Sequence, residues 1–431
     1  MLEVLQLALW ATVAALGIIS SPRLSLYQAF EGLNIPLDFQ AVTLAYADLF
    51  AVLLVLASGL RALAENDYRL RLSETFSALL RRPYAAFFAI FLVVMGLGIL
   101  WARQPGLLIA TTVHFAICAL LSVIGADLVR AHGIGILWPI ALGGAGQAII
   151  GILQVLRNDA LGLSALGEVS RLYYEPDVFF RASGLSMHPN YLGGYLMLAI
   201  FATLCLAWQA HGRLTRTLSI ALGILCTFGM IGTLSRSALL ATVCGLLPLI
   251  WLAWRSMSKR ARRTALSLAG VGSVAALAFT LVAVRGDVAT RFLSGREFFF
   301  ADSWAVIQEA PLLGVGAGNL MHQVWLNVGT TLEPKLPVHN VYLYIWAETG
   351  LLGLAIFGMA LALNLWRLQA RYGAAHLILG CAVLALAVVS LFDNYTWAVH
   401  PHRVLTFWWL GIWWGAAWLP KDIRHSNKLE S

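Results

Sequence analysis

The chain has 431 residues, of which 60% are hydrophobic and only 12% are charged. An ordinary soluble domain carries about a quarter charged residues, and no soluble core of this length absorbs so much apolar surface. The formal net charge of +8 does not indicate nucleic-acid binding, because the basic residues lie in short segments between apolar runs. The composition therefore predicts an all-α polytopic membrane protein.

Runs of about 20 apolar residues predict transmembrane helices, because that length spans the hydrocarbon core of a bilayer. About twelve such runs are present, which indicates a single integral membrane domain over residues 1–431. The first run lacks a charged leader and a cleavage site, so we interpret it as a retained helix. We expect the helices at 3–20, 39–60, 83–102, 107–129, 134–156, 189–210, 217–234, 236–254, 265–284, 341–366, 375–392 and 403–420.

Lys and Arg gather in alternate connecting segments, which predicts an orientation with both termini in the cytoplasm. In that orientation, 18 of the 29 basic residues lie inside and 11 lie outside, as expected because short basic loops resist translocation. Ten of the 11 outer residues are Arg. The guanidinium fork matches phosphate oxygens better than an ammonium group does, so the outer face is expected to bind an anionic, phosphate-bearing ligand.

Two connecting segments are long, and both fall on the predicted outer side: 157–188 and 285–340. The second carries apolar side chains at helical spacing from Glu297 to Ile307, stopped by Pro311, and we expect a short surface helix that lies against the membrane. The first carries aromatic residues that suit a segment resting on the membrane interface, namely Tyr173, Tyr174, Phe179 and Phe180.

His339 is the leading candidate for a catalytic residue, because it stands where the long loop re-enters the membrane at helix 341–366. At about 100° per residue, Tyr342 and Trp346 project to the same side of that helix, while Glu348 points roughly opposite. We therefore expect His339, Tyr342 and Trp346 to line one wall of a cavity. A His at this boundary can act as a general base toward a hydroxyl group. The alternative is an interfacial His that caps a helix.

Three arginines stand near other points where the chain re-enters the membrane. Arg236 lies in a hairpin too short to leave the membrane surface, so it snorkels, pairs with a carboxylate or holds an anion. Arg181 precedes His188 at the start of one helix, and Arg296 starts the expected surface helix. Each alone resembles an ordinary surface Arg. Together with His339 they form a candidate anion-binding site, and His188 is a further candidate for lining it.

The remaining motifs do not indicate a metal or a nucleotide. The segment Gly314–Asn319 fails the dinucleotide pattern, because Asn319 stands where the third glycine belongs. Glu175-Pro176-Asp177 is the nearest approach to a carboxylate pair for a metal, and its central Pro is typical of a turn. The five cysteines lie inside apolar runs without metal-ligand spacing. We expect no metal and no organic cofactor.

The motifs in residues 180–355, taken in their order, resemble those of the O-antigen ligase family. Each motif is weak alone, and the resemblance rests on the order of the motifs along the chain and on the expected topology. The matching residues are Arg181-Ala182-Ser183-Gly184 with His188-Pro189-Asn190, Leu234-Ser235-Arg236-Ser237-Ala238, Gly295-Arg296 with Trp304, Pro311-Leu312-Leu313-Gly314-Val315-Gly316, and His339-Asn340 through Tyr344 to Glu348-Thr349-Gly350 and Gly353.

The resemblance implies an enzyme of the bacterial inner membrane with a periplasmic active site and a fold like that of the glycosyltransferase C class. Such enzymes transfer O-antigen polysaccharide from undecaprenyl pyrophosphate to the lipid A–core oligosaccharide, with inversion and without a metal. His339 matches the histidine that activates the acceptor hydroxyl. Arg181, Arg236 and Arg296 match arginines that bind the donor diphosphate, and such arginines stabilise a leaving group electrostatically.

Three alternatives stay open. An O-antigen polymerase uses the same donor and is described with Arg-x10-Gly motifs, but no outer-loop Arg here has Gly eleven positions later. A protein O-oligosaccharyltransferase shares the histidine-bearing region, and nothing in the sequence reveals the acceptor. A transporter of lipid-linked glycans is expected to carry charges at mid-membrane, whereas Asp48 and Asp127 lie toward the ends of predicted helices.

Overall fold

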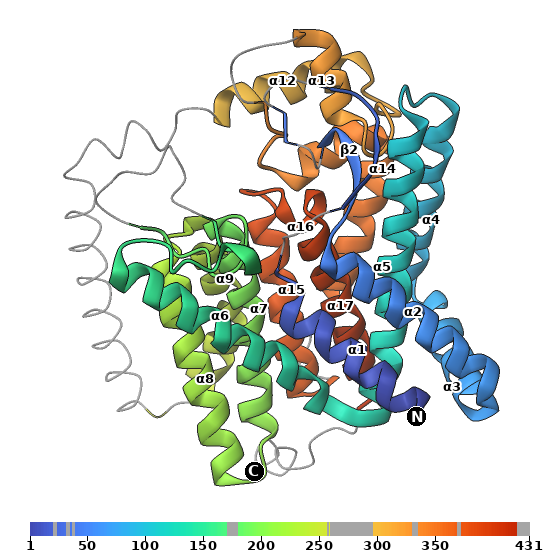
Figure 1. Cartoon of the computed structure of the whole chain (residues 1–431). Coiled ribbons are helices and arrows are strands. Elements are labelled where there is room, and N and C mark those ends of the chain that lie inside the picture. The colour runs from blue at the N-terminus through green and yellow to red at the C-terminus, as the bar shows by residue number, and fades with distance from the viewer. Residues whose placement is uncertain are drawn as a thin grey trace.

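The computed structural model describes residues 1–19, 24–31, 35–36, 39–169, 180–256, 258, 296–329, 335–368 and 372–419. Over these residues the chain is a bundle of helices with one two-stranded sheet (Figure 1). The structure therefore agrees with the predicted all-α class.

Eleven of the predicted membrane helices have a counterpart in the structure, and the other, at 265–284, lies outside the described residues. Seven described stretches are long and apolar enough to cross a membrane, one of which joins two helices over 105–157. The chain is thus a multi-pass membrane protein. The eleven helices are α1 (Leu2–Leu16), α2 (Tyr46–Ala64), α4 (Pro83–Leu97), α5 (Pro105–His132), α6 (Trp138–Arg157), α7 (Pro189–Gln209), α8 (Arg213–Gly232), α9 (Arg236–Ser256), α14 (Val341–Trp366), α15 (Ala374–Val389) and α17 (His400–Ala416).

The helix predicted at 39–60 begins later than expected. Ala41–Leu44 form strand β2, which pairs antiparallel with β1 (Leu24–Gln28). The carboxylate of Asp48 accepts a hydrogen bond from the backbone N–H of Ala45 at 2.8 Å, so it caps α2 at its actual start. Apolarity alone does not separate a short strand from a helix, which explains the error.

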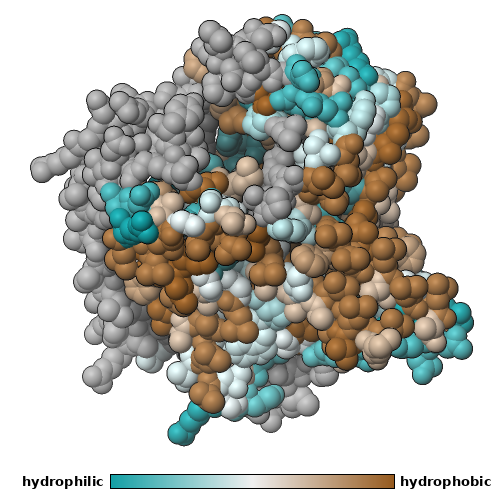
Figure 2. Space-filling model, viewed as in Figure 1, coloured by the Kyte–Doolittle hydropathy of each residue, from teal (hydrophilic) through white to brown (hydrophobic). Residues whose placement is uncertain are grey.

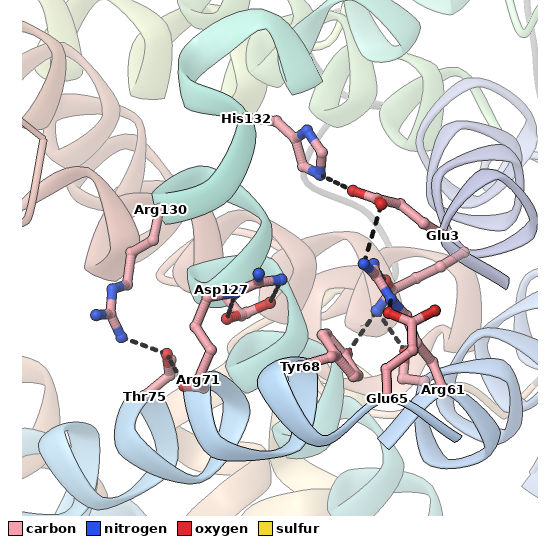
Figure 3. Close-up of polar contacts among 11 residues, drawn as sticks. Glu3, Arg61, Glu65, Tyr68, Arg71, Thr75, Asp127, Arg130 and His132 are labelled. Carbon is pink, nitrogen blue, oxygen red and sulfur yellow. Dashed lines mark hydrogen bonds and ion pairs between the residues drawn. The ribbon is translucent and has the colours of Figure 1, made fainter. Parts of the chain in front are cut away.

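The search for apolar runs does not predict helix α3 (Asn66–Leu80), because this helix contains no long apolar run. It buries only Tyr68, Thr75 and Leu79 and exposes most of its charged residues, as an amphipathic surface helix does. Figure 3 shows the polar contacts around it: the Arg71 guanidinium donates two hydrogen bonds, of 2.8 and 3.1 Å, to the buried carboxylate of Asp127. These contacts fix α3 to α5.

Both ends of the described chain lie near α3. The Arg61 guanidinium pairs with Glu3 of α1 at 3.0 Å and lies 4.5 Å from the ring of Tyr68 in α3 (Figure 3). The Arg130 guanidinium donates to Thr75 of α3 and lies 5.1 Å from the ring of Trp418. The start of α1 and the end of α17 are therefore at the same end of the bundle.

The opposite end carries α12 (Arg296–Glu309) and α13 (Leu320–Val328), at the top of Figure 1. The helix expected from Glu297 to Ile307 is present as α12. Its apolar side chains do not form one face, however. Val306 and Ile307 are buried in the protein, whereas Phe298, Phe300 and Trp304 are exposed.

The surface between these two ends is apolar. Figure 2 shows a brown belt across the viewed face, with teal residues gathered toward α12 and α13 at the top and toward α3 at the lower right. We assign to the membrane-facing surface the exposed large apolar side chains on α2 and α5, among them Leu49, Leu53, Ile109 and Val113. This arrangement is the one expected of a protein whose middle contacts lipid.

Helix α14 is interrupted at Gly350, which has φ +68°. The segment 311–316, which follows α12, hydrogen-bonds at this break. Backbone N–H groups of Val315 and Gly316 donate to the carbonyls of Ala347 and Glu348 at 3.0 and 2.8 Å, and the N–H of Leu351 donates to the carbonyl of Pro311 at 2.9 Å. The connection between α12 and α13 is thereby fixed to α14.

Candidate functional site

Arg181 is held in place by two hydrogen bonds just before α7. Its Nε donates to the carbonyl of Thr233 at 3.0 Å, and its Nη2 donates to Oδ1 of Asn190 at 2.9 Å. Thr233 lies in the turn between α8 and α9, three residues before Arg236, which is exposed at the start of α9. The structure therefore brings Arg181 to the turn that carries Arg236.

The same turn contains a backbone conformation that is unusual for its residue type. Leu234 has φ +50°, in the left-handed region that bulky side chains rarely occupy. The backbone N–H of Ser235 donates to Oγ1 of Thr233 at 3.1 Å, and the Thr233 hydroxyl donates to the carbonyl of Met230 at 2.7 Å. Strain of this kind is often found where a turn must present a functional group.

A buried polar chain leads from Arg181 toward His339. Nδ2 of Asn190 donates to Oδ2 of Asp393 at 2.7 Å, and the backbone N–H of Asn394 donates to Oδ1 of Asp393 at 2.9 Å. Nδ2 of Asn394 in turn donates to the carbonyl of Val338 at 3.1 Å. Asp393 is buried, so its carboxylate needs these partners.

His339 stands at the start of α14, on a backbone held from two sides. The side chain of Asn340 caps α14 by accepting from the N–H of Leu343 at 3.0 Å, and it donates to the carbonyl of Leu391 at 3.0 Å. The half-buried imidazole stacks on Phe299 of α12, with ring centroids 5.8 Å apart. Arg296 begins the same helix, one turn before Phe299.

The other proposed cavity-lining residues make specific contacts. The hydroxyl of Tyr342 donates to the carbonyl of Ala387 in α15 at 2.8 Å. Nε1 of Trp346 donates to the carbonyl of Pro311 at 2.9 Å, and its ring packs edge-on against Trp304. Tyr342 thus contacts α15, whereas Trp346 contacts α12.

His188 has a capping role. Its Nδ1 accepts a hydrogen bond from the N–H of Asn190 at 3.1 Å at the start of α7, and its ring lies 5.4 Å from that of Tyr191. His188 therefore orients Asn190, the residue that contacts Arg181. It remains a candidate for lining the site.

Glu168 organises the described part of loop 157–188. Its carboxylate accepts hydrogen bonds from the N–H groups of Leu161 and Leu163, at 2.7 and 2.6 Å, and from Nε2 of Gln154 at 2.7 Å. Burial opposes ionisation of Glu168, but these hydrogen bonds outweigh it, and the pKa of Glu168 is lowered. The aromatic cluster from Tyr173 to Phe179 and the Glu175–Asp177 pair lie outside the described residues.

Sequence reasoning missed the residues that connect the predicted ones. The motif His188-Pro189-Asn190 gives Asn190 no role by itself, and none of the sequence motifs contains Asp393 or Asn394. Asp393 is 203 residues away from Asn190 in sequence, so no spacing pattern links them. A useful signal was present, since the Asp393-Asn394 pair lies between two apolar runs, where a buried carboxylate needs a partner.

Comparisons with known proteins bear on this region of the chain. A family model described as O-antigen ligase matches residues 221–358, which include Arg236, Arg296 and His339. The O-antigen ligase of Salmonella typhimurium (strain LT2) is 27% identical over 222 residues, which cover 46% of this chain and 50% of the relative. The chain thus spans about half the length of the curated relative it matches.

The fold is that of a multi-pass, all-α membrane protein. The matches to the family model and to the Salmonella protein confirm the resemblance to the O-antigen ligase family.

Proposed function

We propose that the protein transfers O-antigen polysaccharide from undecaprenyl pyrophosphate to the lipid A–core oligosaccharide at the periplasmic face of the inner membrane. The observation that carries this proposal is the hydrogen-bonded chain from Arg181 through Asn190, Asp393 and Asn394 to the carbonyl just before His339. It couples the position of the arginine-bearing segment to that of the histidine.

The arginines act on the donor. Breaking the bond between the anomeric carbon and the diphosphate oxygen leaves negative charge on the diphosphate. In this proposal Arg181, Arg236 and Arg296 stabilise this charge, and the hydrogen bonds that Arg181 donates to Thr233 and Asn190 support its part in it. Fixed donors of this kind lower the barrier because they need not reorganise during the reaction. This role replaces the divalent cation that other glycosyltransferases use.

His339 acts on the acceptor. Its imidazole takes the proton of the acceptor hydroxyl as the oxygen attacks the anomeric carbon from the face opposite the diphosphate, so the configuration inverts. A positioned base of this kind contributes about 10²–10⁴-fold to the rate. The packing of His339 on Phe299 limits the orientations of the ring.

The experiment is transfer from purified undecaprenyl-pyrophosphate glycan to lipid A–core by well-inserted protein. We expect His339→Ala to bind the donor but not to transfer it, and Arg181→Ala or Arg236→Ala to weaken donor binding as well. The control is His211→Ala, an exposed residue between α7 and α8. Near-normal transfer by His339→Ala dismisses the base assignment.

Two further arms of the same assay test the remaining parts of the proposal. Transfer should survive EDTA, and a loss restored by Mg²⁺ or Mn²⁺ refutes metal independence. Offering free O-antigen glycan or an acceptor protein in place of lipid A–core distinguishes a polymerase or a protein O-oligosaccharyltransferase. Transfer to either of these, with none to lipid A–core, overturns the ligase assignment.

A further inference from the structure

A second polar cluster lies apart from the Arg181–His339 region, beneath the β1–β2 hairpin. It lines a cavity of about 210 Å³ between α2, α5, α14, α17 and the start of α13. The polar side chains at its floor include Asp48, His114, Glu348 and Arg403, all buried, and His400, whose side chain is 24% exposed. None of these five residues has a role in the proposed transfer reaction.

The carboxylate of Asp48 joins two imidazoles. Its Oδ1 lies 2.8 Å from Nε2 of His114, and its Oδ2 lies 2.9 Å from Nδ1 of His400. The two rings stack, with centroids 4.4 Å apart. These three side chains are also the described group whose ligand atoms are close enough to bind a metal, within 4.8 Å of one another.

Arg403 determines which ring nitrogen of His114 carries the proton. Its Nη1 lies 2.9 Å from Nδ1 of His114, and a guanidinium can only donate. Nδ1 of His114 must therefore accept, so the single proton of the neutral ring is on Nε2 and points to Asp48. A metal ion at this place would have to displace that proton and would also face the charge of Arg403. The arrangement disfavours a cation.

An anionic head group also fits poorly. Among the described residues that line the cavity, Arg403 is the only Lys or Arg, and Asp48 and Glu348 line it too. Arg403 is already engaged, since its Nε donates to the carbonyl of Trp397 at 2.7 Å and its guanidinium lies 4.2 Å from the ring of Phe115. A phosphate would therefore meet two buried carboxyl groups and one occupied guanidinium.

A neutral hydroxyl does fit. When the His400 ring is neutral, donation from Nδ1 to the carboxylate of Asp48 leaves Nε2 as an acceptor. That atom has no hydrogen-bond partner in the described part of the chain. An imidazole whose tautomer is fixed by a carboxylate is a well-oriented acceptor for an O–H group. The cavity is therefore equipped to hold a hydroxyl-bearing ligand at His400.

The apolar walls of the cavity indicate that the ligand also has an apolar part. Val52, Leu107 and Ile117 line the cavity, and so do Leu26 of β1 and Val113 of α5, which are also exposed on the surface. Val113 belongs to the apolar face of α5 that we assign to lipid. The cavity thus reaches from a polar floor to the membrane-facing surface, as a site for an amphiphile does.

We propose that this cavity is a second binding site, which takes the hydroxyl-bearing, uncharged head group of an amphiphile such as an alkyl glycoside, with Nε2 of His400 as the hydrogen-bond acceptor. Asp48 positions His400, and Arg403 acts through His114. The inference does not depend on the proposed glycosyl transfer, because it assigns a binding property to residues that the reaction does not use.

The test uses full-length protein in nanodiscs of uncharged lipid, titrated with n-octyl β-D-glucoside below its micelle concentration. Binding is followed by the thermal unfolding midpoint of each variant relative to its own ligand-free value. We expect saturable stabilisation, with the apparent Kd raised about tenfold by His400→Ala or Asp48→Asn, as the loss of one hydrogen bond predicts. His211→Ala is the control.

A second measurement keeps the proposal testable if those variants fold poorly. In the wild-type protein, modification of His400 by diethylpyrocarbonate, read by mass spectrometry, should fall when octyl glucoside is bound but not with octyl phosphate. Equal modification with and without saturating glucoside overturns the proposal. So does saturable binding of octyl phosphate or Zn²⁺ that depends on Asp48. His339→Ala should bind the glucoside normally, so failure here is distinct from failure of the transfer reaction.

Discussion

Asp393 shows how one buried carboxylate organises the candidate site. Its two oxygens accept from different donors, Nδ2 of Asn190 and the backbone N–H of Asn394. Asn190 also accepts from Arg181 through its own Oδ1. Each polar atom in this chain therefore has a defined direction of donation, and a change at one residue must disturb its neighbours.

We expect Asp393→Asn to destabilise the protein by about 1–3 kcal/mol and to weaken binding of the lipid-linked glycan. The NH₂ group of the new amide must face either Nδ2 of Asn190 or the N–H of Asn394, and both of these groups donate hydrogen bonds. The double change Asp393→Asn with Asn190→Asp should recover much of the loss. In that variant the carboxylate introduced at position 190 accepts from both Arg181 and the amide introduced at position 393, so every donor again has an acceptor. Thermal unfolding and donor binding measure both effects, and a double variant no better than Asp393→Asn would contradict the assignment of donors.

Glu168 predicts a pH dependence in loop 157–188. The pKa of its carboxyl is lowered in the folded protein, since hydrogen bonds to the ionised form outweigh burial. Its stabilisation is therefore complete above the ordinary glutamate range, about pH 4.3, and is lost as the pH falls below that range toward the lower folded pKa.

Hydrogen exchange at Leu161 and Leu163, whose N–H groups bond to Glu168, measures this effect. After correction for the intrinsic rate, protection of both amides should fall as the solution becomes acidic, and Glu168→Gln should reduce protection at neutral pH and remove the pH dependence. Asp159→Asn, at an exposed carboxylate in the same loop, is the matched control. Unchanged protection in Glu168→Gln would show that the loop is held by other contacts.

At the scale of elements, the break in α14 connects the surface helices to the bundle. Gly350 has a positive φ, and a Cβ there would overlap the backbone of Leu312 and Leu313. The loop after α12 depends on this close approach for its hydrogen bonds to Ala347, Glu348 and Leu351. Because α12 carries Phe299 onto His339, the break also determines the surroundings of the candidate base.

We expect Gly350→Ala to cost about 1–3 kcal/mol from backbone strain and more from the displaced loop, with a loss of transfer activity. Gly358→Ala is the control, because it lies in the same helix and a Cβ there meets no atom within 4 Å. Thermal unfolding of the two variants and their transfer rates give the comparison. Equal stability and activity would mean that the loop is free to move away from α14 without consequence.

At the scale of the whole molecule, the positions of the ends agree with an even number of membrane crossings. The start of α1 and the end of α17 lie near α3, and α12 and α13 lie at the opposite end. We propose that the α3 end is cytoplasmic, because the basic residues gather in the segments that connect the helices there.

Single-cysteine labelling in a cysteine-free background tests this orientation. A membrane-impermeant maleimide should label Gln308→Cys, exposed on α12, while the inner membrane is intact. It should label Glu74→Cys, exposed on α3, only after that membrane is permeabilised. The reverse pattern would invert the topology and place His339 in the cytoplasm.

The sequence by itself determined the class of fold, the family resemblance and the positions of most membrane helices. Long apolar runs are sufficient for this, because a membrane span must satisfy its backbone hydrogen bonds internally. The same criterion failed at β2, which is apolar but too short to identify, and at α3, which is amphipathic. The local pattern also predicted α12, but not which of its apolar side chains would be buried.

Only the tertiary structure decided which polar residues meet. Arg181 and the turn before Arg236 are 52 residues apart and join through one carbonyl, and Asn190 and Asp393 join across 203 residues. Asp48 and His400 are 352 residues apart, and no partner for Asp48 was evident from its place in the chain. Helix periodicity specifies which way a side chain points, but the packing of distant helices determines what it contacts, and no spacing within one helix contains that information.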